Sequence, residues 1–206
     1  MAAPGNLSPI RSETYENLQL NAGVFLKNFE YSSIADASAL KTAVRSAITA
    51  GTNVLGCTRG GGTFTATREM RTPEIDGVRY PFKGGNFVDS VDAYLSATLV
   101  EVTPDSIKAT LGNATATTSG KITTIKMHTA VESADYLNNL CWVGDISDGR
   151  VVMIVLHNAL NTADFTLTFA DKGEGTLAAE FHAHQAEVTD YDYAPFEIVY
   201  FDLPSA

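Results

Sequence analysis

The sequence predicts an α+β domain that is mainly β: an antiparallel β-sandwich or partial barrel with a few short helices. Three observations support this prediction. Apolar and polar side chains alternate with a period of two along much of the chain, which is typical of strands with one buried face. Turn sequences rich in Gly and Asp separate the alternating segments. Helical spacing with matching end signals occurs in only a few places.

The chain is expected to form a single domain, residues 1–206. A chain of this length buries roughly 70% of the surface that it exposes when unfolded, so it needs neither disulfides nor a structural metal to fold. A charged fraction of 18% beside 45% hydrophobic residues argues against intrinsic disorder. No linker, charge block or internal repeat divides the chain.

In the first half, strands are predicted at residues 18–26 and 54–58. Alternation then runs through residues 61–70 and continues to Asp76-Gly77, a pair that favours a type I′ hairpin turn. The return strand of this hairpin is expected to begin at residues 78–80.

Residues 91–102 form the longest predicted strand. One face of this strand is apolar and consists of Val91, Ala93, Leu95, Ala97 and Leu99. The opposite face carries Tyr94, Val100 and Val102 among polar residues, so we expect both faces to be covered along part of the strand.

The second half continues the strand pattern. Residues 141–146 and 151–157 flank the turn-like Ser147-Asp148-Gly149 and are expected to form a hairpin. Further strands are predicted at residues 121–129, 165–169, 177–183 and 196–201.

Helix signals are clearest in residues 103–112, where Thr103 is a suitable N-cap, Pro104 occupies the first helical position and Gly112 ends the helix. Residues 36–50 have the spacing of an amphipathic helix. A third helical turn is predicted at residues 133–140.

Two segments have no predicted secondary structure. Residues 1–17 are expected to form an N-terminal arm. Residues 113–120 are small and polar, without side chains that could anchor them, and are expected to form a mobile loop.

The chain is acidic, with 24 Asp and Glu against 14 Lys and Arg, a net charge of −10. This balance argues against a protein that grips phosphate backbones, although an acidic surface can face DNA if its role is to avoid sticking. No apolar run approaches the roughly 18 residues of a membrane span, and no secretory signal is visible. A soluble protein made in the cytosol is therefore expected.

No metal or cofactor site is predicted. His182 and His184 are spaced to point from the same face of a strand, as two metal ligands would, but no recognisable third ligand accompanies them. The run Arg59-Gly60-Gly61-Gly62 has neither a Walker loop nor a dinucleotide-binding pattern, and is interpreted as a bend or bulge before a strand.

No catalytic residue is predicted, and the protein is not expected to be an enzyme. Cys57 lies near Arg59, but nothing in the sequence pairs it with a histidine. Both Cys57 and Cys141 are interpreted as small core residues.

Paired carboxylates also lack a catalytic context. Asp145 with Asp148, and Asp190 with Asp192, are interpreted as solvated turn residues rather than as the two carboxylates of a glycosidase.

Six groups of residues follow one another in a recognisable order: LQLNAGVFLKNF (18–29), LGCTRGGGTF (55–64), IDGVR (75–79) with Lys83-Gly84, LVEVTP (99–104), WVGD (142–145) with SDG (147–149), and LHNALNT (156–162) with DKGEG (171–175). In this order they resemble the major tail tube proteins of long-tailed bacteriophages of Gram-positive hosts. The resemblance covers most of the chain from Leu18 to His184.

The resemblance implies a tail-tube-like subunit that forms hexameric rings, stacked into a hollow tube through which DNA is ejected without specific binding. The implied partners are further copies of the chain and the tape measure, tail terminator and baseplate proteins. The implied location is the virion tail, after assembly in the host cytoplasm. Residues 28–53, a long connection, would then be an arm between neighbouring subunits or rings.

Two other functions are considered. A β-sandwich binding module of a phage baseplate would be a stable monomer with an exposed aromatic platform, whereas Trp142 is expected to face the core. The inner tube of a contractile protein-injection machine would share the architecture but pass protein instead of DNA.

Overall fold

A computed structural model of the chain describes residues 10–51, 53–186 and 192–204. Of these residues 43% are in strands and 16% in helices, and the strands pair antiparallel in a sandwich-like arrangement, so the predicted fold class is confirmed. The strands are β1 (Val24–Lys27), β2 (Thr58–Arg71), β3 (Phe87–Leu99), β4 (Ala114–Ser119), β5 (Ile122–Met127), β6 (Leu137–Asp145), β7 (Val151–Asn161), β8 (Leu167–Thr168), β9 (Thr176–His182) and β10 (Phe196–Phe201). The helices are α1 (Ala37–Ala50) and α2 (Pro104–Leu111), with 3-10 turns η1 (Ser12–Asn17) and η2 (Ser133–Asp135).

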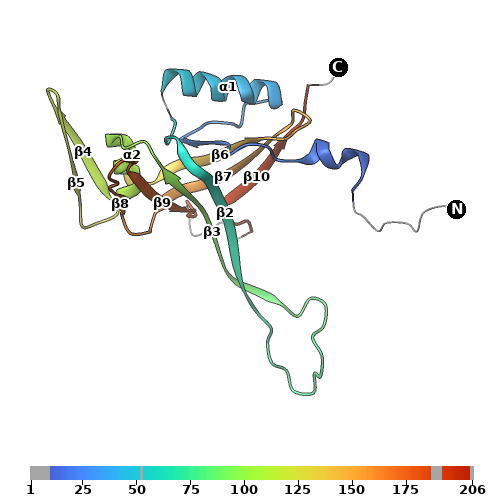
Figure 1. The fold of residues 1–206 in the computed structure, drawn as a ribbon. Helices are drawn as coiled ribbons and strands as arrows, with labels where there is room; N and C mark the ends of the chain where they lie inside the picture. The colour runs from blue at the N-terminus through green and yellow to red at the C-terminus, as the bar shows by residue number, and fades with distance from the viewer. Residues whose placement is uncertain (1–9, 52, 187–191, 205–206) are drawn as a thin grey trace.

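Two sheets form the body of the molecule (Figure 1). Sheet I contains β1, β6, β7 and β10, in that order, and sheet II contains β2, β3, β9 and β8. The end of β7 joins them, because Leu160 and Asn161 pair with β9. β4 and β5 form a separate two-stranded sheet.

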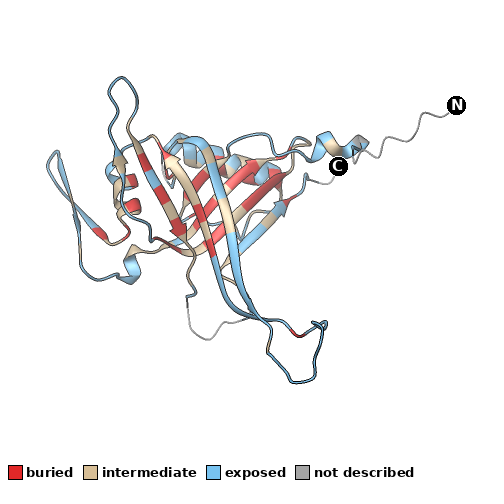
Figure 2. Ribbon diagram, turned by 60° about the horizontal axis from the view of Figure 1, so that its bottom comes forward, coloured by how far each residue is buried: buried red, intermediate tan, exposed pale blue. Residues whose placement is uncertain are grey.

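The core has two parts, one on each face of sheet I. Phe25, Leu140 and Leu156 of sheet I pack against Leu95 and Phe181 of sheet II. On the opposite face, residues of sheet I pack beneath α1. That second cluster includes Leu26, Cys141, Val143, Val151, Met153, Val155, Leu40 and Val44. Figure 2 shows this burial concentrated in the two sheets, while the projecting hairpins are almost entirely exposed.

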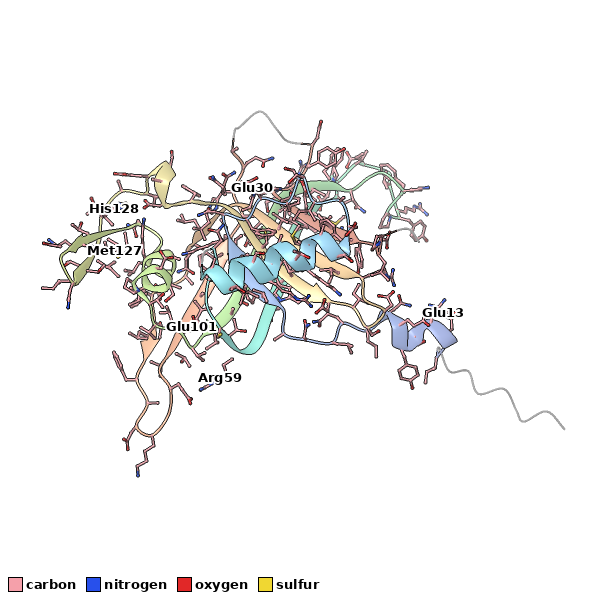
Figure 3. The ribbon with its side chains drawn as sticks, turned by 90° about the horizontal axis from the view of Figure 1, so that it is seen from above. Glu13, Glu30, Arg59, Glu101, Met127 and His128 are labelled. Carbon is pink, nitrogen blue, oxygen red and sulfur yellow. The ribbon has the colours of Figure 1, made fainter. Side chains whose placement is uncertain are left out.

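The amphipathic helix predicted within residues 36–50 is confirmed as α1. The Asp36 side chain accepts a hydrogen bond from the Ala39 N–H at 2.8 Å, and Gly51 ends the helix with a φ of 65°. Leu40 and Val44 are buried against sheet I, which α1 covers (Figure 3). Helix α1 is therefore packed on its own subunit, and a role of residues 28–53 as an arm between subunits stays a prediction.

The glycine run predicted to form a bulge does so within β2. The register between β2 and β3 shifts between Thr58 and Gly62, where Gly60 and Gly61 have positive φ angles of 76° and 77°. A Cβ at Gly62 would lie only 2.4 Å from Phe25 Cζ, so glycine allows sheet II to lie close to sheet I.

The hairpin predicted around Asp76-Gly77 is only partly correct. A turn occurs there, with the Val78 N–H bonded to the Ile75 carbonyl at 3.2 Å, but no strands flank it. The return strand begins at Phe87 instead of at residues 78–80. Pro73 and Pro81 lack the N–H that a strand ladder needs, which explains the irregular segment between them.

The mobile loop predicted at residues 113–120 is wrong, because Ala114–Ser119 forms β4 and pairs with β5 along its whole length. Its threonines favour extended backbone. Gly120, with a φ of 62°, and Lys121 form a two-residue hairpin turn, a signal that the sequence reading overlooked.

Other predicted elements differ in extent. Residues 18–26 contribute only β1 and an isolated bridge at Gln19, and residues 165–169 only β8. The helical turn at residues 133–140 is limited to η2, because β6 already begins at Leu137. The strand predicted at residues 54–58 is wrong, because Val54 forms only an isolated bridge with Leu26, and Thr58 is already the first residue of β2. The remaining predicted strands and α2 are present with shifted ends.

The described part of the predicted N-terminal arm, residues 10–17, contacts the β6–β7 turn. The Asp148 N–H donates to the Glu16 carbonyl at 3.2 Å, and the Ser147 hydroxyl donates to the Tyr15 carbonyl. Residues 1–9 lie outside the described residues. Among the helices that the structure describes, none combines the length and the apolar character that a membrane crossing requires.

Candidate functional site

The β2–β3 hairpin and its neighbour β9 present an open polar surface, which we call the outer face. Because side chains alternate along a strand, every second residue of these strands points away from the core. The outer face consists of Thr63, Thr65, Thr67 and Glu69 from β2, Ser90, Asp92, Tyr94, Ser96 and Thr98 from β3, and Ala178, Glu180 and His182 from β9. The expectation that this face of β3 would be covered is wrong, since none of these side chains is buried.

The outer face is acidic and rich in hydroxyl groups. Its twelve positions include three carboxylates, Glu69, Asp92 and Glu180, and no lysine or arginine. Glu69 accepts a hydrogen bond from the Ser90 hydroxyl at 3.0 Å. An anion over these twelve positions meets negative charge and neutral hydroxyls. Arg59 borders the outer face in a hollow that it shares with Thr63 and Glu180, and its charge is paired with Glu174.

His182 is the only basic group of the outer face. Its ring stacks on Tyr94 with centroids 4.9 Å apart, and its nitrogens lie 2.8 Å from Asp92 and 3.2 Å from Glu180. Burial lowers the pKa of His182, but its hydrogen bonds to the two carboxylates and their charges outweigh burial and raise the pKa above its ordinary value.

The far end of the β2–β3 hairpin, residues 70–91, projects from the body of the molecule as an arm (Figures 1 and 2). Eight large apolar side chains along the arm are between 41% and 81% exposed. They are Met70, Ile75, Val78, Tyr80, Phe82, Phe87, Val88 and Val91. Eight exposed apolar side chains within one projecting segment are typical of an interaction surface on a folded protein.

Two strand edges are also open. β2 ends the strand order of the main sheet, and β10 pairs only with β7. Within the described ranges, no further strand pairs with the outer edges of β2 and β10, whereas the outer edge of β1 is covered by a bridge between Leu26 and Val54. Unpaired backbone groups along a strand edge are ready to pair with another chain.

The two histidines considered as metal ligands have different surroundings. His184 Nδ1 contacts the carbonyl oxygens of His182 and Asn158 at 3.0 and 3.2 Å, and its ring meets the edge of Tyr136. In the part of the chain that the structure describes, no group of three or more His, Cys, Asp or Glu could hold a metal ion.

Cys57 is exposed, which corrects the expectation that it lies in the core; Cys141 is buried as predicted. A hydrogen bond to Glu101 raises the pKa of the Cys57 thiol, and burial adds to this effect. Arg59 pairs with Glu174 rather than with the thiol. Burial also raises the pKa of Cys141, to about 12.

The paired carboxylates are engaged separately. Asp145 lies 3.2 Å from Lys41, while Asp148 binds Arg150. A hydrogen bond from the Arg150 N–H is the main reason that the pKa of Asp148 is lowered. Asp192 is exposed, and Asp190 lies outside the described residues.

Trp142 forms no exposed aromatic platform. Its Nε1–H donates to the Ala22 carbonyl at 2.9 Å, and the partly buried ring packs over Gly144 and against the core between the sheets. The prediction that Trp142 faces the core is confirmed in this sense.

Sequence reasoning missed the arm and the outer face as surfaces. The alternation of Thr with apolar residues in residues 63–67 was the available signal for the outer face. The arm carries no comparable signal, because its apolar residues resemble those of a buried strand.

No protein-family model matches the sequence, and a comparison with curated proteins finds no relative.

Proposed function

We propose that the chain is a structural subunit that polymerises with copies of itself into stacked, hexameric rings, forming a phage tail tube through which DNA is ejected. The β2–β3 hairpin carries the proposal. Its far end exposes apolar side chains that need a partner, and its near end presents the acidic outer face.

Self-association is the simplest use of the arm. An isolated monomer would leave its eight apolar side chains in water, whereas contact with a second copy removes them from solvent. The arm has little net charge of its own, with Arg71, Arg79 and Lys83 against Glu74, Asp76 and Asp89. Electrostatic repulsion between copies is therefore weak at this surface.

Open strand edges favour the same conclusion. In a heterologous contact, one surface of a subunit binds a different surface of its neighbour. Such contacts form a closed ring when the rotations from one subunit to the next add up to a full turn, and a closed ring leaves no strand edge exposed. Several sheets joined in this way form a barrel too wide for side chains to fill, so its interior stays open.

The outer face suits the wall of such an opening. Proteins that hold DNA neutralise phosphates with Lys and Arg and so release counterions. Twelve outward positions without either residue provide none of that affinity, and their carboxylates repel phosphate. DNA would then move past the wall without being retained. The order of motifs resembling tail tube proteins supports this assignment and, with it, a place in the virion tail beside tape measure, terminator and baseplate proteins.

Electron microscopy of the purified protein, combined with a shortened arm, tests the proposal. Arg71 and Phe87 are paired at the base of the arm, so an Asn-Gly turn can replace residues 72–86 without disturbing the strands. We expect rings or tubes from the natural chain, and a folded protein that no longer forms tubes from the shortened one. A natural chain that stays a single compact particle at every concentration contradicts the proposal.

A further inference from the structure

The β4–β5 hairpin, here called the ribbon, has little contact with the rest of its own chain. It projects beyond α2 (Figure 1), and Ala114 is its only buried residue among those of the two strands. Ile122 and Met127 are 70% and 64% exposed. A two-stranded hairpin alone is only marginally stable in water, so the ribbon is suited to gain order from a partner.

The ribbon is positively charged in an acidic protein. Residues 106–131 include Lys108, Lys121 and Lys126 and no aspartate or glutamate, although the whole chain carries a net charge of −10. Lys121 and Lys126 bracket β5, one in the turn and one near the end of the strand. The partner of the ribbon is therefore expected to be acidic.

β10 has the complementary properties. Its edge away from β7 pairs with no strand among the described residues, and Ile198 and Tyr200 are 51% and 62% exposed. Glu197 and Asp202 lie within β10 and directly after it. Within its own chain, the Glu197 carboxylate accepts a hydrogen bond from the Tyr31 hydroxyl at 3.1 Å and lies 3.3 Å from His157 Nε2, and the Asp202 carbonyl accepts from the Ala37 N–H at 2.9 Å. No lysine or arginine occurs from residue 173 to the end of the sequence.

The spacing of these charges gives a register. The two lysines are five positions apart, and so are the two carboxylates. Antiparallel pairing of β5 with β10 that sets Ile125 opposite Ile198 also sets Lys126 opposite Glu197 and Lys121 opposite Asp202. Cross-strand pairs of opposite charge and of apolar side chains both stabilise a sheet. The antiparallel direction matches every pairing within sheet I.

The two strands lie apart within one copy. In Figure 3, Met127 and His128 mark the ribbon at one end of the molecule, and Glu13 marks η1 at the other. In Figure 1, β10 runs beneath α1 toward the end where the C-terminus lies, away from the ribbon. Pairing of β5 with β10 would thus join two copies head to tail.

We propose that β5 of one copy adds to the free edge of β10 in a second copy, extending sheet I across the boundary between subunits. The contact is heterologous, and repeated around a closed rotation it produces a ring. This inference rests on the proposed self-assembly and assigns the lateral contact to two named strands.

Disulfide trapping tests the register in a Cys57→Ser background, since Cys57 is exposed and Cys141 is buried. Ile125→Cys and Ile198→Cys are introduced in separate proteins, which are then mixed and oxidised. Directly opposed residues in an antiparallel pair are close enough for a disulfide, so we expect a cross-linked dimer of the two. Ile122→Cys mixed with Ile198→Cys is the matched control. The register separates that pair by three residues, roughly 10 Å, and no cross-link is expected.

A charge exchange supplies an independent readout. Lys121→Asp places like charges opposite each other and should raise the concentration needed for assembly roughly tenfold or more, as should Asp202→Lys. The two changes combined should restore assembly. Lys172→Asp, an exposed lysine outside the ribbon, is the control and should assemble like the natural chain.

The outcomes separate this inference from the proposed function. If the natural chain assembles but Ile125→Cys and Ile198→Cys do not cross-link, and Lys121→Asp assembles normally, the β5–β10 contact is refuted while self-assembly stands. If the natural chain never assembles, the proposed function fails as well.

Discussion

His182 Nδ1 lies 2.8 Å from Asp92 Oδ1, at the point where β9 runs beside β3 on the outer face. This contact binds the only basic group of the outer face to one of its three carboxylates. The charge of the surface therefore depends on whether the imidazole carries a proton.

Replacing His182 should change how stability depends on pH. The pKa of His182 is raised in the folded protein, because its bonds to Asp92 and Glu180 outweigh the opposing effect of burial. The stabilisation is complete below the unfolded pKa of about 6.5 and is lost as the pH rises through the higher folded value. Urea unfolding at several pH values should show this loss in the natural chain and not in His182→Gln.

The control for that experiment is His184→Gln. His184 contacts carbonyl oxygens and Tyr136 instead of carboxylates, so its replacement should leave the pH dependence in place. An unchanged pH dependence in His182→Gln would contradict the role given to the contact with Asp92.

The docking of α1 on sheet I predicts unequal effects along one helix. Leu40 of α1 is fully buried against sheet I, and Leu40→Ala should lower the free energy of unfolding by about 2–5 kcal/mol, since it leaves a cavity in the core. Ile48 on the same helix is 48% exposed, and Ile48→Ala should cost less than about 1 kcal/mol. Denaturant unfolding measures both. Equal effects would mean that α1 does not pack on its own subunit.

Adding lysines to the outer face should turn a conduit that does not hold DNA into one that retains it. Thr63→Lys with Thr67→Lys introduces two cations at outward positions of β2. If the outer face lines the tube, assembled tubes of this variant should bind DNA in low salt and release it as salt rises, because each phosphate contact releases counterions. Sedimentation of tubes with labelled DNA measures the bound fraction.

The matched control is Thr63→Gln with Thr67→Gln, which changes size without adding charge and should leave DNA unbound. Equal retention by the lysine, glutamine and natural tubes would show that the outer face does not meet the DNA.

Local signals explain why the helices could be predicted from sequence. Thr103 caps α2 by accepting a hydrogen bond from the Ser106 N–H at 3.1 Å, Asp36 caps α1, and glycines follow both helices. All these contacts join residues a few positions apart, so the sequence contains the whole interaction.

The same reasoning was less successful for the arm and the ribbon. Val78 and Tyr80 alternate with polar residues like a strand, yet Tyr80 is 81% exposed in an irregular segment. The ribbon shows the opposite error, since its small polar residues resemble a loop but pair along six positions. In both cases the deciding factor is whether a second strand lies alongside, which a period-two pattern does not report.

The sequence alone predicts four features: the β-rich class, the two capped helices, the acidic balance of the chain and the bulge at Gly60–Gly62. Each of them depends on composition or on contacts between residues that are near neighbours in the chain. The tertiary structure decided which residues share a surface. It brought Asp92, Glu180 and His182 together from β3 and β9, and it left the arm and the edge of β10 without partners. Strand order and register set those relationships through pairings between residues far apart in the chain, and no local pattern specifies them.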